Sequence, residues 1–343
     1  MAEYTIFIGT FSKGKENGLF YGNFDNKNGK LSIKENLDIE SPAYLQVKDD
    51  ILYVVSETNV YMGENGGAVF SADFSVGYGE GLKLLDIKAT HGKSPCHLCI
   101  TNDNIFVSNY SEGSLSIFRI NGNGLIEDSY QSLTHFGSSI REDRQKESHV
   151  HFAAISPDGS YLGLCDLGMD KVFFYPYSKE KGISTEAKII NCPPGSGPRH
   201  FIFSLCGNYL YVLTELKSTI LCYEYKNDDF IFLYEVSILP QDYEGKSTAA
   251  AIHLSPCGNY LAASNRGHDS IAVFKIDKEV ALNHLCHVMT GKTPRDFRFS
   301  PCGKWLLSAN QGDDSVSIFS FENELFTKKE EVKIPKPSCI VFT

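Results

Sequence analysis

The tetrapeptide Ser156-Pro157-Asp158-Gly159 decides the fold, because it returns three times further along the chain. The copies are Ser204-Leu205-Cys206-Gly207, Ser255-Pro256-Cys257-Gly258 and Ser300-Pro301-Cys302-Gly303. They are spaced by roughly 45 to 51 residues, a period typical of repeat architectures. Proline and glycine at these positions are typical of tight turns. The sequence therefore predicts a repeated unit that is built around a turn.

A second motif follows each turn after one short apolar segment. Ser264-Asn265-Arg266-Gly267-His268-Asp269-Ser270-Ile271 is one copy, and residues 108–118 and 309–319 match it. The segments in between are short, rich in β-branched and aromatic residues, and bounded by Gly, Asn, Asp and Ser, as strands and hairpins are. Together with the blade-like period, this pattern predicts an all-β fold, a seven-bladed β-propeller. Degenerate copies that complete the seven begin at Gly9, Ser56, Cys165 and Leu213.

The two ends of the sequence predict how the propeller closes. The first copy has no opening strand before it, whereas residues 336–342 resemble an opening strand such as residues 293–299. We expect the C-terminal strand to complete the first blade, which removes exposed sheet edges. A single domain over residues 1–343 follows from this closure. The polar stretch from His135 to Ser148 is expected to be an insertion loop between blades.

Composition argues against several classes of function. The net charge is −10 and no basic block or stripe is present, so nucleic acid is not expected as a partner. No apolar run is long enough to span a bilayer. Residues 1–8 have the pattern of a strand and not of a signal peptide. We expect a cytoplasmic protein that has no membrane partner and whose ten cysteines are reduced structural thiols.

Opening strands line the central channel of a propeller, so side chains at one position of each strand should converge there. Five residues before the turn serine, three blades carry an ionisable side chain: His151, Arg199 and Arg295. The loop after the second strand adds Glu215 and Arg266 from adjacent blades. If both positions face the same mouth of the channel, these five side chains form one site.

This set of side chains suits the hydrolysis of an ester or a lactone. Ring opening needs a base that activates water and donors for the developing oxyanion. His151 or Glu215 can supply the base, and arginine can hold a carboxylate or a phosphate through two hydrogen bonds. No Gly-x-Ser-x-Gly sequence sits at a strand-to-helix turn, so we expect direct attack by water. Ion pairs of Arg199 and Arg266 with Glu215 between blades are the structural alternative.

Three segments, in this order, carry a resemblance to a known family. The first runs from Ser148-His149-Val150-His151 to Asp166-Leu167-Gly168-Met169-Asp170. The second contains Gly195-Ser196-Gly197-Pro198-Arg199-His200 and Thr214-Glu215-Leu216, and the third is residues 264–271. Together they resemble the seven-bladed lactonase family, which includes bacterial 6-phosphogluconolactonases of the propeller type. Fungal carboxy-cis,cis-muconate cyclase is a related member.

The resemblance implies a lactonase that opens 6-phosphogluconolactone to 6-phosphogluconate and needs no cofactor, and the arginines at the channel mouth indicate that no metal is bound. The substrate would be a phosphorylated sugar lactone, which Arg295 and His200 are expected to bind. An ion pair with Asp296 is the alternative for Arg295, and packing between blades is the alternative for His200. The active-site groups proposed for the related cyclase fall by motif on His151, Arg199, Glu215 and Arg266.

Other interpretations stay open at this point. A cyclase or lyase acting on a carboxylated muconate would use the same arginines on carboxylates. A non-catalytic interaction propeller predicts no converging polar side chains. Gly195-Ser196-Gly197 resembles a phosphate-cradling loop, although it precedes a strand and not a helix. A metal-dependent lactonase is disfavoured by the arginines, and its candidate ligands would be Glu57, Asn109, Glu215 and Asn310.

Overall fold

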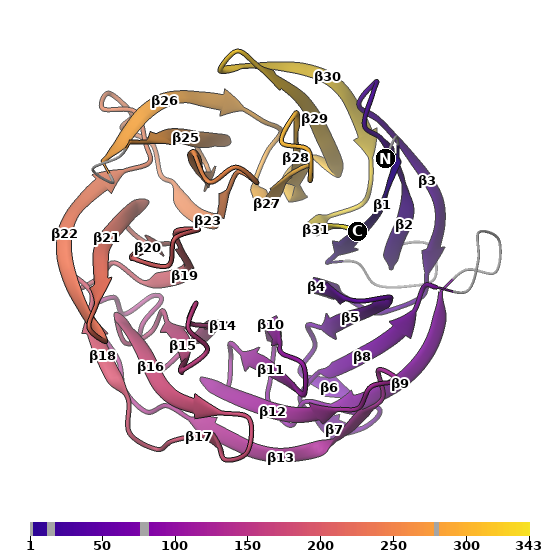
Figure 1. The fold of residues 1–343 in the computed structure, drawn as a ribbon, viewed down its shortest axis with the longest axis vertical. Coiled ribbons are helices and arrows are strands. Elements are labelled where there is room, and N and C mark those ends of the chain that lie inside the picture. The colour runs from indigo at the N-terminus through magenta and orange to yellow at the C-terminus, as the bar shows by residue number, and fades with distance from the viewer. Residues whose placement is uncertain (1–2, 12–17, 76–81, 278–280) are drawn as a thin grey trace. The chain divides into compact units, whose positions relative to one another are not determined.

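The structure is a computed structural model that describes residues 3–11, 18–75, 82–277 and 281–343. Helical structure in these ranges is confined to one 3-10 turn, η1 (Gln311–Asp313). The strands of these ranges form seven sheets of four or five strands and one small hairpin, which confirms the predicted all-β class and the seven blades (Figure 1). The chain divides into two compact units. Unit 1 is Met1–Ile8, Phe20–Lys34 and Pro198–Thr343, and unit 2 is Gly9–Leu19 and Glu35–Gly197.

Unit 1 carries four blades, in each of which four strands pair side by side (Figure 1). In order of pairing, one blade is β31 (Pro337–Phe342), β1 (Glu3–Thr10), β2 (Leu19–Asp25) and β3 (Lys30–Leu37). A second blade of unit 1 is formed by β19 (Pro198–Phe203), β20 (Tyr209–Thr214), β21 (Thr219–Lys226) and β22 (Asp229–Ser237). It is followed by β23 (Thr248–Leu254), β24 (Tyr260–Arg266), β25 (Ser270–Ile276) and β26 (Leu282–Met289). The last is β27 (Pro294–Phe299), β28 (Trp305–Asn310), β29 (Ser315–Glu322) and β30 (Leu325–Lys333).

The pairing of β31 with β1 confirms that the C-terminal strand completes the first blade. The backbone N–H of Thr343 donates to the carbonyl oxygen of Thr5 at 3.0 Å, next to this pair of strands. Strands from the two ends of the chain therefore share one hydrogen-bonded sheet. No helix of the described residues is long and apolar enough to cross a membrane.

Unit 2 carries the other three blades. The first is β4 (Pro42–Lys48), β5 (Ile51–Ser56), β8 (Ala68–Asp73) and β9 (Lys83–Ala89), with the hairpin β6 (Val60–Tyr61) and β7 (Glu64–Asn65) between β5 and β8. The second is β10 (Pro95–Ile100), β11 (Asn104–Asn109), β12 (Ser114–Ile120) and β13 (Ile126–Thr134). The third is β14 (Val150–Ile155), β15 (Tyr161–Asp166), β16 (Lys171–Ser178), β17 (Gly182–Ile183) and β18 (Lys188–Asn191). Residues 135–149 between β13 and β14 contain no strand, which confirms the predicted insertion loop.

The turn motif closes the first hairpin of four blades. Ser156 Oγ accepts a hydrogen bond from the backbone N–H of Tyr161 at 2.9 Å, and the other three serines do the same at 3.1 Å. The glycine that ends each motif has a φ of +73° to +77°, a conformation that favours glycine. In three blades a cysteine Sγ lies 3.2 to 3.3 Å from the serine Oγ. The cysteine thus takes the place that Asp158 has beside Ser156.

In the second motif, the side chain of an asparagine forms hydrogen bonds to two serine hydroxyls across the following hairpin, and we call these bonds the hairpin latch. Asn109 Nδ2 donates to the hydroxyls of Ser114 and Ser116 at 3.1 and 2.9 Å. Asn310 makes the same two bonds, at 3.2 and 2.9 Å, to the serines five and seven residues later. All these residues are buried, so their polar groups need partners inside the protein. These hydrogen bonds stabilise the hairpins that contain Asn109 and Asn310.

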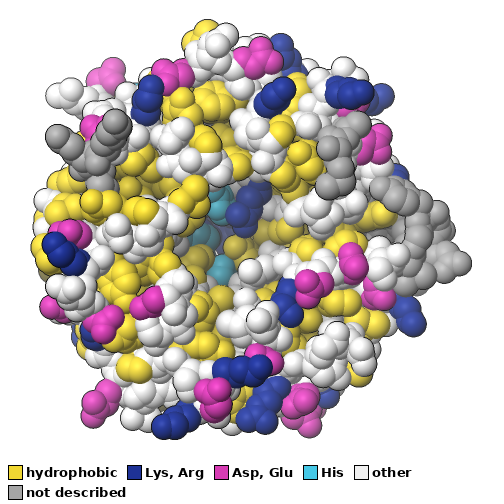
Figure 2. Space-filling view, in the orientation of Figure 1, with side chains coloured by type: hydrophobic (Ala, Val, Ile, Leu, Met, Phe, Trp, Pro, Cys, Tyr) yellow, Lys and Arg dark blue, Asp and Glu magenta, His cyan; other side chains and the backbone are white. Residues whose placement is uncertain are grey.

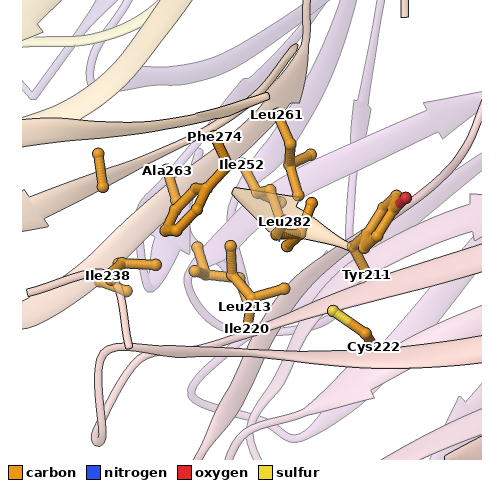
Figure 3. Packing of buried hydrophobic residues seen from close by; sticks show 12 residues of the cluster. Tyr211, Leu213, Ile220, Cys222, Ile238, Ile252, Leu261, Ala263, Phe274 and Leu282 are labelled. Atoms are coloured by element: carbon orange, nitrogen blue, oxygen red, sulfur yellow. The ribbon is translucent and has the colours of Figure 1, made fainter. Parts of the chain in front are cut away.

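Within each unit, apolar side chains of adjacent blades pack against one another. In unit 1, side chains of the β19–β22 and β23–β26 blades meet in one cluster, which includes the fully buried Tyr211, Leu213 and Phe274 (Figure 3). The outermost strands β22 and β30 instead alternate between exposed and partly buried residues, as strands with one solvated face do. On the face shown in Figure 2, acidic and basic side chains are interspersed.

Candidate functional site

β-Bulges place the three ionisable residues that the repeat aligns. The register between β19 and β20 shifts between Pro198 and His200, so Arg199 is an extra residue in its strand. The same shift occurs around His151 in β14 and around Arg295 in β27. A bulge bends its strand and re-aims a side chain, and bulges are frequent beside active sites. The position that the sequence singled out therefore has one backbone geometry in all three blades.

Arg199, Glu215 and Arg266 meet in a buried charge cluster within unit 1. Arg199 Nε and Arg266 Nη2 lie 3.0 and 2.9 Å from the same carboxylate oxygen, Glu215 Oε2. Arg199 and Glu215 are each 3 % exposed, and the side chain of Arg266 is 15 % exposed. Two guanidinium groups share one carboxylate, so the three side chains carry an excess positive charge. Such a cluster favours an anionic ligand.

The neighbouring backbone and His200 hold these guanidinium groups in place. Arg266 Nη2 donates to the carbonyl oxygen of Ala249 at 2.8 Å, and Arg199 Nη1 donates to that of Ala250. Arg199 Nη1 also lies 3.1 Å from His200 Nε2. Since a guanidinium group can only donate, His200 Nε2 is the acceptor in this contact. His200 thus orients Arg199, and its contact with substrate stays a prediction.

His151 lies in unit 2 and belongs to a stack of aromatic rings. Its side chain is buried, and its ring meets the ring of Tyr110 edge-on, with 5.6 Å between centroids and an angle of 80°. His149 stacks in parallel on Tyr110 at 4.3 Å, and its Nδ1 lies 3.0 Å from the carbonyl oxygen of Tyr110. Arg144 Nη2 donates to the hydroxyl of Tyr110 at 3.3 Å. The predicted convergence of His151 with the arginines stays a prediction.

Sequence reasoning assigned no role to Tyr110 or to Arg144. Tyr110 occupies the position after the hairpin latch that Glu215 and Arg266 occupy in other blades, so the repeat could have singled it out. Arg144 lies in the insertion loop, which has no counterpart in the other repeats. Alignment of the repeats therefore contained no signal for Arg144.

Arg295 is partly buried on β27, and its neighbour Asp296 has partners on two other strands. Asp296 Oδ1 lies 2.8 Å from His253 Nε2, and Asp296 Oδ2 accepts the backbone N–H of Ile340 at 3.0 Å. Arg298 Nη1 lies 3.0 Å from His253 Nδ1. Burial, together with the charge of Arg298, lowers the pKa of His253. These contacts link β23, β27 and β31, and the role of Arg295 in substrate binding stays a prediction.

The amides of Gly195-Ser196-Gly197 bind a carboxylate of the protein itself. The N–H groups of Gly195 and Gly197 each donate to Asp170 at 2.6 Å, one to each carboxylate oxygen. Gln145 Nε2 and the hydroxyl of Ser139, both from the insertion loop, donate to the same carboxylate at 2.8 and 2.5 Å. The resemblance to a phosphate-cradling loop is therefore wrong, because Asp170 occupies the place of the anion.

A second buried carboxylate, Asp166, holds the ends of the insertion loop. Asp166 Oδ2 accepts the hydroxyl of Ser148 at 2.6 Å and lies 2.8 Å from His135 Nδ1. Asp166 Oδ1 accepts the backbone N–H of His149 at 2.9 Å. Burial opposes the ionisation of Asp166, but the hydrogen bonds from His135, Ser148 and His149 outweigh it and lower the pKa.

Asp166→Asn is expected to make the free energy of unfolding depend less strongly on pH at acid pH. Because the pKa of Asp166 is lower in the folded state, its stabilisation is present above the unfolded-state pKa of about 4 and is lost as the pH falls through the folded pKa. Urea unfolding of both proteins at a series of pH values from 7 down to 3 measures the effect. The free energy of unfolding should fall more steeply in the wild type below about pH 4. If the free energy of unfolding falls equally steeply with pH in both proteins, Asp166 is not the source of this pH dependence.

Comparisons with known proteins agree with this architecture. The family model described as "Lactonase, 7-bladed beta-propeller" matches residues 5–342. A 6-phosphogluconolactonase of Bacillus subtilis is 32 % identical over 308 residues, which are 87 % of this chain and 86 % of the relative. A 6-phosphogluconolactonase of Formosa agariphila is 32 % identical over 304 residues, 85 % of each chain. Among solved structures, the periplasmic gluconolactonase of Pseudomonas aeruginosa has a TM-score of 0.92 and 30 % identity over 99 % of both chains. The chain belongs to the seven-bladed β-propeller lactonase family, and it is a lactone hydrolase.

Proposed function

We propose that this lactonase hydrolyses 6-phosphogluconolactone to 6-phosphogluconate, and that His151 is the general base. The observation that carries the proposal is the sharing of one buried carboxylate oxygen by Arg199 and Arg266. This arrangement keeps two guanidinium groups in place and leaves an excess positive charge, which suits an anionic substrate. The names of the Bacillus subtilis and Formosa agariphila relatives support the same substrate. A cytoplasmic location belongs to this proposal.

The reaction needs one water molecule and no cofactor. His151 takes a proton from water as the water oxygen attacks the carbonyl carbon of the lactone. The bond between this carbon and the ring oxygen then breaks, and the ring oxygen receives the proton from His151 and becomes a hydroxyl group. The product is a hydroxy acid, which loses a proton to the solvent. Each turnover therefore returns His151 to its starting state.

His151 suits the role of base better than Glu215 does. Imidazole is the commonest general base near neutral pH. Glu215 Oε2 already forms ion pairs with two guanidinium groups, so proton abstraction by this carboxylate would compete with both pairs. We assign Arg199 and Arg266 to the negative charge that develops on the carbonyl oxygen. Glu215 positions them, and Arg295 and His200 are proposed to contact the sugar.

A panel of freshly prepared substrates tests the proposal. The value of kcat/KM for 6-phosphogluconolactone should exceed that for gluconolactone by about tenfold or more, because a charged hydrogen bond to phosphate contributes about 1.5–3 kcal/mol. Initial rates are corrected for spontaneous ring opening. A rate for 6-phosphogluconolactone no faster than the spontaneous one would contradict the proposal, and turnover of a carboxylated muconate alone would favour the cyclase. Activity should persist in EDTA, whereas its loss would favour a metal-dependent lactonase.

A further inference from the structure

We propose that a cleft between strands β9 and β13 is a second binding site, and that its ligand is a neutral sugar. The cleft contains two adjoining cavities of about 360 and 350 Å³, within the size range of small-molecule sites in proteins. Both lie in unit 2, between two blades whose apolar side chains pack together (Figure 1). This site is independent of the proposed function, because none of the described residues that line it takes part in the lactonase reaction.

Two walls of different chemistry form the cleft. One wall is β9 with the β6–β7 hairpin, and it presents apolar surface from Tyr61 and Ile87. The other wall is β12 with β13, and it presents a series of hydroxyl groups. His91, Asp128 and Ser129 line both cavities, so a ligand longer than one sugar ring can extend from one cavity into the other.

The strand register explains why space is left at this place. Ser129 and Ser132 lie opposite Phe118 and Ser116 of β12, and two other blades carry larger side chains at the same register positions. These larger side chains are Lys328 and Glu331 on β30 and His284 and His287 on β26. Serine side chains are too short to fill the same volume, so this blade has a cleft where the β27–β30 blade has an ion pair.

Contacts between the two blades hold the walls of the cleft in place before any ligand binds. Asp86 Oδ2 accepts the backbone N–H of the first residue of β13 at 3.0 Å. Ser116 Oγ donates to the carbonyl oxygen of Thr90 at 2.5 Å. Lys88 Nζ donates to Asp128 Oδ1 at 3.0 Å, from one wall to the other. A ligand therefore binds to a preformed site and pays little entropy for ordering it.

The charges around the cleft suit an uncharged ligand. Lys88 pairs with Asp128, and Lys93 Nζ lies 3.9 Å from Glu112 Oε2. These two carboxylates and that of Glu64 line the cavities, so a phosphate or carboxylate group would meet like charges. A cationic ligand would have to compete with Lys88 for Asp128. A neutral ligand meets neither obstacle.

The hydroxyl groups and the aromatic ring match the two kinds of surface on a sugar. Within the described part of the chain, the side chains of Ser129, Ser132 and Thr134 make no hydrogen bond. Each hydroxyl can therefore both donate to and accept from a sugar hydroxyl, and the ring nitrogens of His91 add a donor and an acceptor. The ring of Tyr61 offers an apolar surface to the C–H groups of a sugar ring.

The β27–β30 blade supplies a design for a variant that fills the cleft. Ser129→Lys together with Ser132→Glu places a lysine and a glutamate at the register positions of Lys328 and Glu331, which form an ion pair at 2.6 Å. The net charge is unchanged. Ser129→Ala together with Ser132→Ala keeps the space and removes two hydroxyls. Ser160→Lys is the control, because this exposed serine lies in a hairpin turn outside both cavities.

Saturation-transfer NMR with maltose, cellobiose and glucosamine as probes measures binding. The wild type should bind at least one of the neutral disaccharides at millimolar concentrations. The double alanine variant should raise its Kd by about 5- to 100-fold, the value of two neutral hydrogen bonds. The filled variant should not bind it, and Ser160→Lys should bind it as the wild type does. All variants should keep the wild-type kcat/KM for 6-phosphogluconolactone and the wild-type thermal unfolding midpoint.

Four results would overturn the assignment of this cleft. The first is a wild type that binds neither disaccharide. The second is an unchanged Kd in both double variants. The third is binding that His151→Gln abolishes and the filled variant keeps, which would place the sugar in the lactonase site. The fourth is binding of glucosamine alone, lost in the filled variant, which would make the cleft a cation site. A wild type that binds a disaccharide but hydrolyses no lactone would contradict the proposed function and leave this site standing.

Discussion

Replacing His151 with glutamine is expected to lower kcat for 6-phosphogluconolactone by about 10²–10⁴-fold, the usual contribution of a general base. Glutamine keeps a polar side chain at the bulge of β14 but cannot carry the proton from water to the ring oxygen. Binding depends on other groups, so KM should change much less than kcat. Initial rates at one pH, corrected for spontaneous ring opening, measure both constants.

His149→Gln is the matched control for this prediction. His149 is two residues from His151 and contacts the same tyrosine ring, but the proposed reaction gives it no proton to transfer. Its variant should keep kcat within about tenfold of the wild type. Thermal unfolding of both variants checks that the blade is intact. If kcat falls equally in the His151→Gln and His149→Gln variants, the contacts between the rings are needed to keep the site folded, and His151 is not the base.

Glu215→Ala is expected to reduce both stability and activity. The substitution leaves the guanidinium groups of Arg199 and Arg266 without their shared carboxylate, and breaking a buried ion pair costs about 3–5 kcal/mol. Both arginines then lose the group that positions them, so kcat/KM should fall by at least about 10²-fold, the usual cost of one lost oxyanion donor. Urea unfolding followed by circular dichroism measures the free energy, and the lactone assay measures kcat/KM.

Glu324→Ala is the control for Glu215→Ala, because it removes a glutamate from an ion pair at the surface and not from a buried one. Glu324 pairs with Lys275 at 2.6 Å, but both side chains are well exposed, at 39 % and 54 %. Exposed pairs contribute about 0.2–1 kcal/mol, so this variant should unfold almost as the wild type does and keep its activity. A Glu215→Ala protein as stable as Glu324→Ala would contradict the assignment of a buried, structurally required charge cluster.

The blades could be predicted from the sequence because their signals are local and repeated. Ser156 and its counterparts bond to a backbone N–H five residues later, and the latch of Asn109 reaches only seven residues along the chain. Any copy of such a motif therefore reports its own hairpin. The alignment also placed His151 and Arg199 at one position, and the structure explains this by a shared β-bulge. The bulges themselves could not be predicted, because the proline or valine that precedes each of them does not indicate a shift in strand register.

Contacts between segments far apart in the sequence could not be predicted in this way. The bond of Arg144 to Tyr110 joins the insertion loop to a residue 34 positions earlier in the sequence, at the end of β11. Asp170 binds amides 25 and 27 residues ahead of it, at Gly195 and Gly197, which looked like a phosphate site from their composition alone. The pairing of Asp296 with His253 likewise depends on two strands being neighbours. Such partners follow from packing, which a residue pattern does not encode locally.

The mechanism's central claim is that oxygen from water reaches the carbonyl carbon in one step. Single-turnover hydrolysis of 6-phosphogluconolactone in water enriched in oxygen-18, with enzyme in excess, tests this claim directly. Mass spectrometry of the product should find one heavy oxygen in the carboxylate of 6-phosphogluconate from the first turnover onward. A first-turnover product without the label would contradict the mechanism, because its new oxygen would then come from a carboxylate of the protein, such as Glu215.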